Sequence, residues 1–367
     1  MALRPVLADG LPLSGRRRLA HFIGPRLSAL DRVGHSYEVR CFGLQRPAAI
    51  LGVIGAWRSL AARLLWEQEV AGSNPAAPTT LWPMIAVTGA SGGVGGRVAR
   101  ALAAQGLPLR LIVRDAARAP ELGAEVAVAT YRDGAAMRAA FEGAETIYLV
   151  SGSESADRVA EHFSAVDAAA AAGVRRIVYV SFMGASPDCV FTFARDHAAT
   201  EERIRSCGLD HVFLRSCMYA EYVPLFASPE GVIRGPAGEG RAAFVSRDDV
   251  ADVAAAVLAS PGGHDGRTYD VTGPEALSLD DAAALLGRAA GREVVYERET
   301  LEQARDSRRP SGAPDWEIEG WVTSYAALDA GDLEPPSDTA QRILGRPPRS
   351  LADVLREHPE RMAHLSR

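Results

Sequence analysis

Residues 84–95 have the sequence Met-Ile-Ala-Val-Thr-Gly-Ala-Ser-Gly-Gly-Val-Gly, in which a short apolar run leads directly into a glycine-rich segment. The run is typical of a buried strand. After it, Val94, Val98 and Leu102 recur every four residues, as they would on one face of a helix. The order strand, glycine turn, helix favours a binding site for a dinucleotide over a turn with a purely structural role.

The glycines of this segment have separate physical tasks. One permits the tight turn, one lets backbone N–H groups approach a pyrophosphate, and one lets the helix pack close to the strand. The N-terminus of the helix then faces the phosphates, where its free N–H groups favour negative charge. We therefore predict cofactor contacts at Gly89, Ser91, Gly92, Gly93, Val94 and Gly95.

The second predicted strand, Leu109–Val113, ends at Arg114 and Asp115, and Asp115 follows Gly95 by 20 positions. An acid at this place would bind the ribose 2′-hydroxyl of NAD, whereas an arginine would accommodate the 2′-phosphate of NADP. Arg114 comes first after the strand, and its planar guanidinium suits a phosphate. We predict a preference for NADP(H), with NAD(H) possible.

The order of strand and helix repeats further along the chain. An apolar strand over residues 145–150 is followed by an alanine-rich helix over 156–172 and a strand over 177–180. This alternation predicts a parallel sheet with helices on both faces, and ligands outside the carboxyl ends of its strands. Ser151 and Ser181 follow two such ends. We expect Ser151 to contact the cofactor and Ser181 to belong to the catalytic group.

Two further residues are candidates for proton chemistry. His197 shares one face of a predicted helix with Phe193, Thr200 and Ile204, so its side chain points inward. It is either a satisfied core histidine or a pocket group that exchanges a proton near neutral pH. Tyr219 follows the strand that begins at His211, and it is either a pocket phenol or a loop aromatic.

The basic residues exclude several mechanisms. All 40 of them are arginine, because the chain contains no lysine. A Schiff-base enzyme, a phosphate loop with the Gly-Lys-Ser/Thr ending and a reductase with a Tyr-x-x-x-Lys pair each need a lysine. The four cysteines form no CxxC pair, so neither a disulfide framework nor a metal site is predicted. We expect a cytoplasmic protein without a membrane segment, because the longest apolar run, residues 48–57, is too short.

The charge divides the chain into two unlike parts. Residues 1–83 hold 10 arginines against 5 acids, and residues 84–367 hold 30 against 41. The first part lacks a sustained helical or strand period. We predict that it is disordered or not natively translated, since Gly72–Pro75 and Pro78–Thr79 fit the conceptual translation of a tRNA gene. The first alternative for this part is a real basic tail. A tail that binds nucleic acid is the least favoured alternative, because no aromatic interleaving or helical basic face accompanies the charge. The acidic second part gives no electrostatic reason to expect nucleic acid as a partner.

Several of these motifs together resemble a known family. The segments that show the resemblance are the turn Thr88–Gly95, the strand end Val113–Asp115, the run Ala171–Ser181 and the segment Ser246–Val253. They are similar to the NmrA-like branch of the atypical short-chain dehydrogenase/reductases, and most similar to the bacterial NAD(P)H:quinone oxidoreductases of type 2. The likeness extends from Met84 almost to the C-terminus.

The resemblance implies a Rossmann-type doubly wound sheet with a smaller C-terminal α/β subdomain, and a substrate cleft between them. We expect residues 84–232 to bind mainly the nucleotide and 233–367 to form mainly the cleft. Plant isoflavone-reductase relatives have a lysine near the position of His197, whereas the resembling quinone reductases have a histidine. Many relatives also carry an acid where this chain has Thr130.

Two function classes follow from this resemblance. The first is direct hydride transfer from the nicotinamide to a quinone or enone, with His197, Tyr219 and Ser181 as catalytic residues. The second is a non-catalytic NADP(H) sensor, because NmrA-like proteins include regulators. A helix over 316–330 carries an aromatic stripe in which Trp316 or Trp321 would wall a flat substrate, unless the stripe is simply core. Whether the chain is a monomer or a homodimer stays open.

Overall fold

A computed structural model describes residues 82–260 and 262–365 of the chain. The predicted N-terminal extension lies outside the described residues except for its last two positions, so the expectations for it stay predictions. The described residues form one compact unit. Among the described helices, none has the length and apolar character that crossing a bilayer requires.

The described residues build a main sheet of seven parallel strands in the order β3-β2-β1-β4-β5-β6-β9. This confirms the predicted α/β fold with a doubly wound parallel sheet. The strands are β1 (Ile85–Thr88), β2 (Leu109–Val113), β3 (Glu125–Val128), β4 (Thr146–Leu149), β5 (Arg176–Phe182), β6 (Asp210–Ser216) and β9 (Arg267–Val271).

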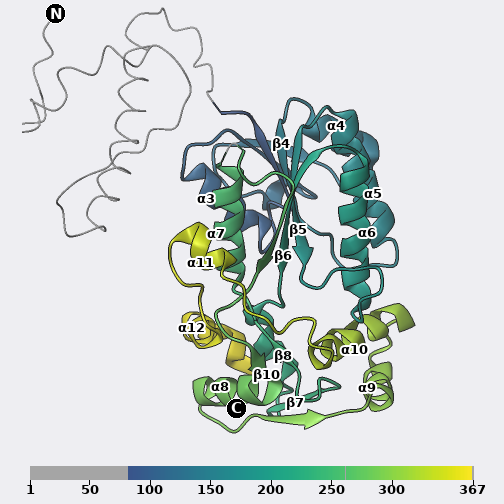
Figure 1. The fold of residues 1–367 in the computed structure, drawn as a ribbon, viewed down its shortest axis with the longest axis vertical. Coiled ribbons are helices and arrows are strands. Elements are labelled where there is room, and N and C mark those ends of the chain that lie inside the picture. Colours follow the sequence, from purple (N-terminus) through teal and green to yellow (C-terminus); the bar gives the residue numbers. More distant parts are fainter. Residues whose placement is uncertain (1–81, 261, 366–367) are drawn as a thin grey trace, which may run out of the picture. The chain divides into compact units, whose positions relative to one another are not determined.

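Strands β1 and β4 at the centre are buried along their whole length because helices cover both faces of the sheet. Every residue of β1 and of β4 is buried. Helices α3 and α7 lie on one face, and α4, α5 and α6 lie on the other (Figure 1). Their bounds are Gly95–Ala103 for α3, Gly134–Phe141 for α4, Arg158–Ala171 for α5, Thr192–Ser206 for α6 and Arg247–Leu258 for α7.

A smaller layer lies below the carboxyl ends of the main strands (Figure 1). It contains a parallel pair, β7 with β11, and an antiparallel pair, β8 with β10. The elements are β7 (Val232–Gly235), β8 (Arg241–Ala242), β10 (Leu277–Ser278), α8 (Leu279–Ala290), β11 (Val295–Arg298), α9 (Leu301–Arg308), α10 (Asp315–Asp329) and α12 (Leu351–Glu357). Helix α11 (Thr339–Leu344) packs instead against α7 and β9 of the large sheet.

The division expected at residue 232 needs a correction. After β8 the chain returns to the nucleotide-binding layer, where α7 packs against α3 and β9 extends the main sheet beside β6. The residues between 247 and 271 therefore belong structurally to the large sheet. The apolar side chains of α7 are the physical reason, because they complete the layer that α3 alone leaves uncovered.

Helix starts in the second half follow the expected capping chemistry. Ser278 and Asp281 form a reciprocal capping box at the start of α8, and Ser350 forms one with Asp353 at the start of α12. The predicted helix over 316–330 is α10.

Candidate functional site

The chain order reverses at β1, because β2 and β3 lie on one side of it and β4, β5, β6 and β9 on the other. The loops after β1 and β4 therefore diverge at the carboxyl ends of the strands, the usual place for a ligand in such sheets. A cavity of about 840 Å³ lies there. Every predicted site residue lines it: Gly89, Ser91, Gly92, Gly93, Val94, Gly95, Arg114, Ser151, Ser181, His197 and Tyr219.

The glycine turn has the close packing that a dinucleotide cradle needs. Gly89 has a φ of +59°, which glycine adopts without strain. A Cβ on Gly95 would lie 2.5 Å from the Gly89 carbonyl oxygen and 2.7 Å from that of Thr88. Val94, the N-cap of α3, makes no side-chain capping hydrogen bond, so no capping side chain competes with an anion at the start of the helix. The residues present thus fit the pyrophosphate of NAD(P)H.

One arginine beside the turn was not predicted. A Cβ on Gly93 would lie 2.8 Å from an Nη atom of Arg247, the first residue of α7. The Arg247 guanidinium also lies 5.2 Å from the ring centroid of Tyr222, and Glu221 accepts hydrogen bonds from the Arg247 backbone N–H. The sequence signalled this segment only through the family resemblance, because α7 and the turn are 150 residues apart.

Arg114 and Asp115, the two residues that follow β2, differ in their surroundings. Arg114 is exposed and lines the cavity. Asp115 instead caps the short helix at 116–118, with its Oδ1 accepting a hydrogen bond of 3.0 Å from the Ala117 N–H. A second arginine, Arg132, lines the same end of the cavity and is paired with Glu161 at 2.7 Å. Sequence reasoning missed Arg132, since β3, which brings it there, was not predicted.

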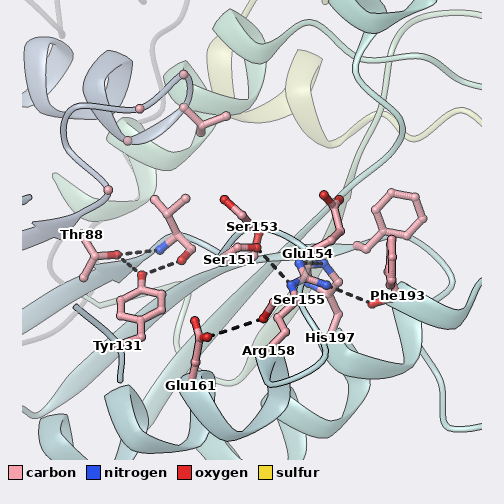
Figure 2. Close-up of a pocket in the computed structure, with 18 of the residues that line it drawn as sticks. Thr88, Tyr131, Ser151, Ser153, Glu154, Ser155, Arg158, Glu161, Phe193 and His197 are labelled. Carbon is pink, nitrogen blue, oxygen red and sulfur yellow. Dashed lines mark hydrogen bonds between the residues drawn. The ribbon is translucent and has the colours of Figure 1, made fainter. Parts of the chain in front are cut away.

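A hydrogen-bond network of hydroxyl groups joins the end of β1 to the loop after β4 (Figure 2). The Tyr131 hydroxyl donates to the Val150 carbonyl oxygen at 2.6 Å and contacts the Thr88 Oγ1 at 2.6 Å. The Val150 N–H donates to the same Thr88 Oγ1 at 2.9 Å. Burial raises the pKa of Tyr131, so its hydroxyl keeps its proton. This network fixes the loop after β1 relative to the loop after β4.

The serine-rich loop that begins at Ser151 is held from the side of α5. The Gly152 N–H donates to Nε2 of His162 at 2.8 Å, and the Gly152 carbonyl accepts from Nε of Arg158 at 3.0 Å. Burial, and next the charge of Arg158, lower the pKa of His162 to about 3. His162 is therefore a neutral hydrogen-bond acceptor at physiological pH.

His197 is buried on α6 and also lines the cavity. Its Nε2 lies 3.0 Å from Nη2 of Arg158, and its Nδ1 lies 2.9 Å from the Tyr179 hydroxyl. A guanidinium only donates, so Nε2 accepts and the imidazole proton sits on Nδ1. Burial, and next the charge of Arg158, hold the pKa of His197 well below its ordinary value. His197 is therefore a buried, hydrogen-bonded group that also borders the cavity, and a catalytic role for it stays a prediction.

Ser181 and Tyr219 differ in what they can offer a substrate. The Ser181 hydroxyl donates at 2.7 Å to Oε1 of Glu201, which is 1% exposed. The Tyr219 hydroxyl lies 3.5 Å from Oγ of Ser216, at the long end of hydrogen bonding, and burial raises its pKa. A ligand oxygen can therefore displace the contact of Tyr219 more easily than that of Ser181.

Besides Tyr131, aromatic side chains from β5, α6, α10 and the loops after β5 and β6 wall the cavity. Trp321 of α10 lines the cavity, as the sequence allowed. Trp316 packs against Phe193 instead, with ring centroids 6.1 Å apart, and is not among the lining residues. The aromatic lining consists of Phe182, Phe191, Phe193, Tyr219, Tyr222, Phe226 and Trp321. Such a wall suits a flat, apolar ring.

Comparisons with known proteins agree with this geometry. The family model described as NAD(P)H-binding matches residues 89–261. The chain is 32% identical over 281 residues to the NAD(P)H azoreductase of Xenophilus azovorans, covering 75% of this chain and 98% of the relative. It is 33% identical over 279 residues to quinone oxidoreductase 2 of Escherichia coli strain K12, covering 74% and 96%.

Solved structures extend the comparison to the fold. The NADPH complex of the Escherichia coli NADPH-dependent quinone oxidoreductase has a TM-score of 0.69 at 32% identity, covering 75% of this chain and 99% of that one. NmrA, a negative transcriptional regulator, has a TM-score of 0.60 at 20% identity, covering 75% and 95%, and shares the fold. The resemblance to the quinone oxidoreductases is confirmed, and the chain belongs to the NAD(P)H-binding family of oxidoreductases that contains these relatives.

Proposed function

We propose that this protein transfers a hydride from NADPH to a quinone-like or enone acceptor. The observation that carries the proposal is the continuity of one cavity from the glycine turn to the aromatic wall. NADPH supplies the hydride from its dihydronicotinamide ring. With its pyrophosphate on the turn, the aromatic wall is left for a flat acceptor beside that ring. The names of the quinone reductase and azoreductase relatives support an acceptor of this kind.

Two arginines support a preference for NADPH over NADH. Arg114 and Arg132 both line the cavity, in the loops that follow β2 and β3, and a 2′-phosphate would lie beside the end of β2. Asp115, which would serve the 2′-hydroxyl of NAD, uses an oxygen to cap the next turn of chain. Thr130, where many relatives carry an acid, adds no negative charge at this end.

The candidate catalytic residues take three different roles in this proposal. Tyr219 gives the proton that the reduced acceptor needs, since its hydroxyl is protonated and only weakly engaged. His197 is a positioning residue, because its Nε2 accepts a hydrogen bond from Arg158 and its pKa is held low. Ser181 shapes the wall through its bond to Glu201.

A steady-state assay tests the proposal. NADPH oxidation is followed with a panel of small quinones and enones, and dissociation constants for NADPH and NADH are measured by fluorescence titration. We expect acceptor-dependent loss of NADPH and tighter binding of NADPH than of NADH. Tight NADPH binding with no acceptor-dependent turnover would instead indicate a sensor of the NmrA type. A preference for NADH would overturn the assignment of Arg114 and Arg132.

A further inference from the structure

Arg158, the first residue of α5, presents a buried positive charge to the cavity. The residue is 4% exposed and lines the cavity between the serine loop and His197 (Figure 2). Its Nε donates to the Gly152 carbonyl, Nη1 donates to the Phe193 carbonyl at 3.3 Å, and Nη2 donates to Nε2 of His197 at 3.0 Å. These three acceptors are uncharged, so they orient the guanidinium without neutralising it.

The carboxylate beside Arg158 compensates this charge only weakly. Oδ2 of Asp196 lies 3.4 Å from Nη1 of Arg158, and burial raises the pKa of Asp196 in spite of the arginine. Arg215 shows the contrast, since it makes a two-pronged pair with Glu201, at 2.8 Å from Nε and 2.7 Å from Nη2. A buried charge whose counter-ion is held only by a long contact is costly, and such groups concentrate at functional sites.

The remaining hydrogen-bonding capacity of Arg158 is on Nη2. The hydrogen bonds found among residues 82–260 and 262–365 engage Nε–H, both N–H bonds of Nη1 and one of Nη2. A guanidinium has five N–H bonds, so one on Nη2 is left for a ligand. His197 fixes the direction of this group, because its Nδ1 is in turn anchored by Tyr179.

We propose that Arg158 is a catalytic residue that stabilises the oxyanion formed on the acceptor. This inference rests on the proposed function. The C–H bond of the dihydronicotinamide breaks, and the hydride carries its electron pair to the acceptor, which is reduced as the nicotinamide is oxidised. One carbonyl oxygen of the acceptor then becomes an anion, which the fixed guanidinium stabilises until it takes the proton of Tyr219. Water restores that proton. A preorganised donor in a water-poor site is an effective way to stabilise such charge.

An equilibrium titration tests the inference without turnover. The protein saturated with NADP⁺ is mixed with 4-nitrophenol, which stands in for the phenol product, and the phenolate is followed by absorbance across pH. We expect bound 4-nitrophenol to ionise at least one pH unit below the free compound. In Arg158→Met this shift disappears. Arg203→Met, which removes a guanidinium that pairs with Asp167 on the outer side of α6, is the matched control and should retain the shift.

The wild-type titration alone can overturn the inference, even if Arg158→Met does not fold. Ionisation of bound 4-nitrophenol at or above the pH of the free compound would contradict it, and so would failure of the phenol to bind at any pH. A lowered ionisation pH without quinone reduction would contradict the proposed function and leave the role of Arg158 standing. Quinone reduction without the lowered ionisation pH would overturn the role of Arg158 alone.

Turnover supplies a second measurement. We expect Arg158→Met to lower kcat about 100-fold, the effect of removing one oxyanion donor, with the KM for NADPH changed less than about threefold. Guanidinium ion added to Arg158→Ala should restore part of the rate. An equal loss in kcat and in NADPH affinity, with no rescue, would indicate that Arg158 only holds the serine loop.

Discussion

The two ends of the cavity are built in different ways. The cofactor end is formed largely by backbone from one continuous stretch, Thr88–Gly95, whose glycines leave no room for side chains. The acceptor end is formed by side chains from α5, α6, α10 and the loop after β6, and its central group is a buried network around Arg158. The first end is therefore sensitive to added atoms, and the second to the loss of particular polar groups.

This difference predicts separable defects. Changes at the turn should weaken NADPH binding before they affect chemistry. Changes in the Arg158 network should slow turnover while NADPH still binds. A variant that moves both quantities together would show that the two ends are not independent.

The largest expected effect is at Gly95. A Cβ in Gly95→Ala would meet two carbonyl oxygens, at 2.5 and 2.7 Å, so the turn must open and the N–H groups that face the pyrophosphate move. We expect NADPH affinity to fall more than about 100-fold, measured by fluorescence titration. Gly134→Ala is the control, because its nearest neighbour is the rotatable Ser164 hydroxyl at 3.1 Å. Unchanged affinity in Gly95→Ala would contradict the assignment of the turn.

A smaller effect is expected at His197. His197→Ala leaves Nη2 of Arg158 without its acceptor and should lower kcat about 50-fold, with little change in the KM for NADPH. His197→Gln, whose carbonyl oxygen can take the place of Nε2, should recover part of the rate. The pKa of His197 is held low, so a plot of kcat against pH should show no inflection near the ordinary histidine pKa. An inflection there in the wild-type profile that disappears in His197→Ala would indicate that His197 is the proton donor instead.

A substitution of Arg114 tests the cofactor end through the preference for NADPH over NADH. Arg114→Leu removes a charged contact to a 2′-phosphate, which is worth about 1.5–3 kcal/mol. We expect NADPH affinity to fall about 20-fold and NADH affinity to stay within about twofold, compared by titration of both cofactors. Equal weakening for NADPH and NADH would mean that Arg114 does not contact the 2′-phosphate.

The last prediction concerns folding rather than catalysis. His162 has a pKa of about 3 in the folded protein against 6.5 in the unfolded chain, so acid protonates the unfolded chain first. Its contribution to stability is complete above pH 6.5 and is lost as pH falls from 6.5 toward 3, by up to about 1.4 kcal/mol per pH unit. Urea unfolding of His162→Gln should show a shallower decline with pH over this window than wild type. Parallel declines would contradict the buried, neutral His162.

The comparison also explains what the sequence could predict. The turn from β1 into α3 was predictable because strand, glycines and helix are adjacent in the chain, and β2 matched its expected bounds, Leu109–Val113. Strand β3 was not predicted, because Val126 and Val128 are exposed on an edge strand and show no buried pattern. Arg132, which follows β3, was missed for the same reason.

The acceptor end was harder to predict for a different reason. Arg158 looked like one polar residue of an alanine-rich helix, and its burial comes from Phe193 and His197, more than thirty residues later. The sequence indicated that His197 points inward, but its protonation depends on Arg158 and Tyr179, which only the tertiary packing brings together. Periodicity identifies faces of helices, whereas the partners across the cavity are set by the fold.

The most direct test of hydride transfer within this cavity uses NADPH deuterated at the transferable C4 position. Quinone-dependent NADPH oxidation is measured with protiated and deuterated cofactor. The predicted result is an acceptor-dependent rate with a primary isotope effect and deuterium lost from the oxidised nicotinamide. Tight NADPH binding with no quinone-dependent oxidation would contradict the account.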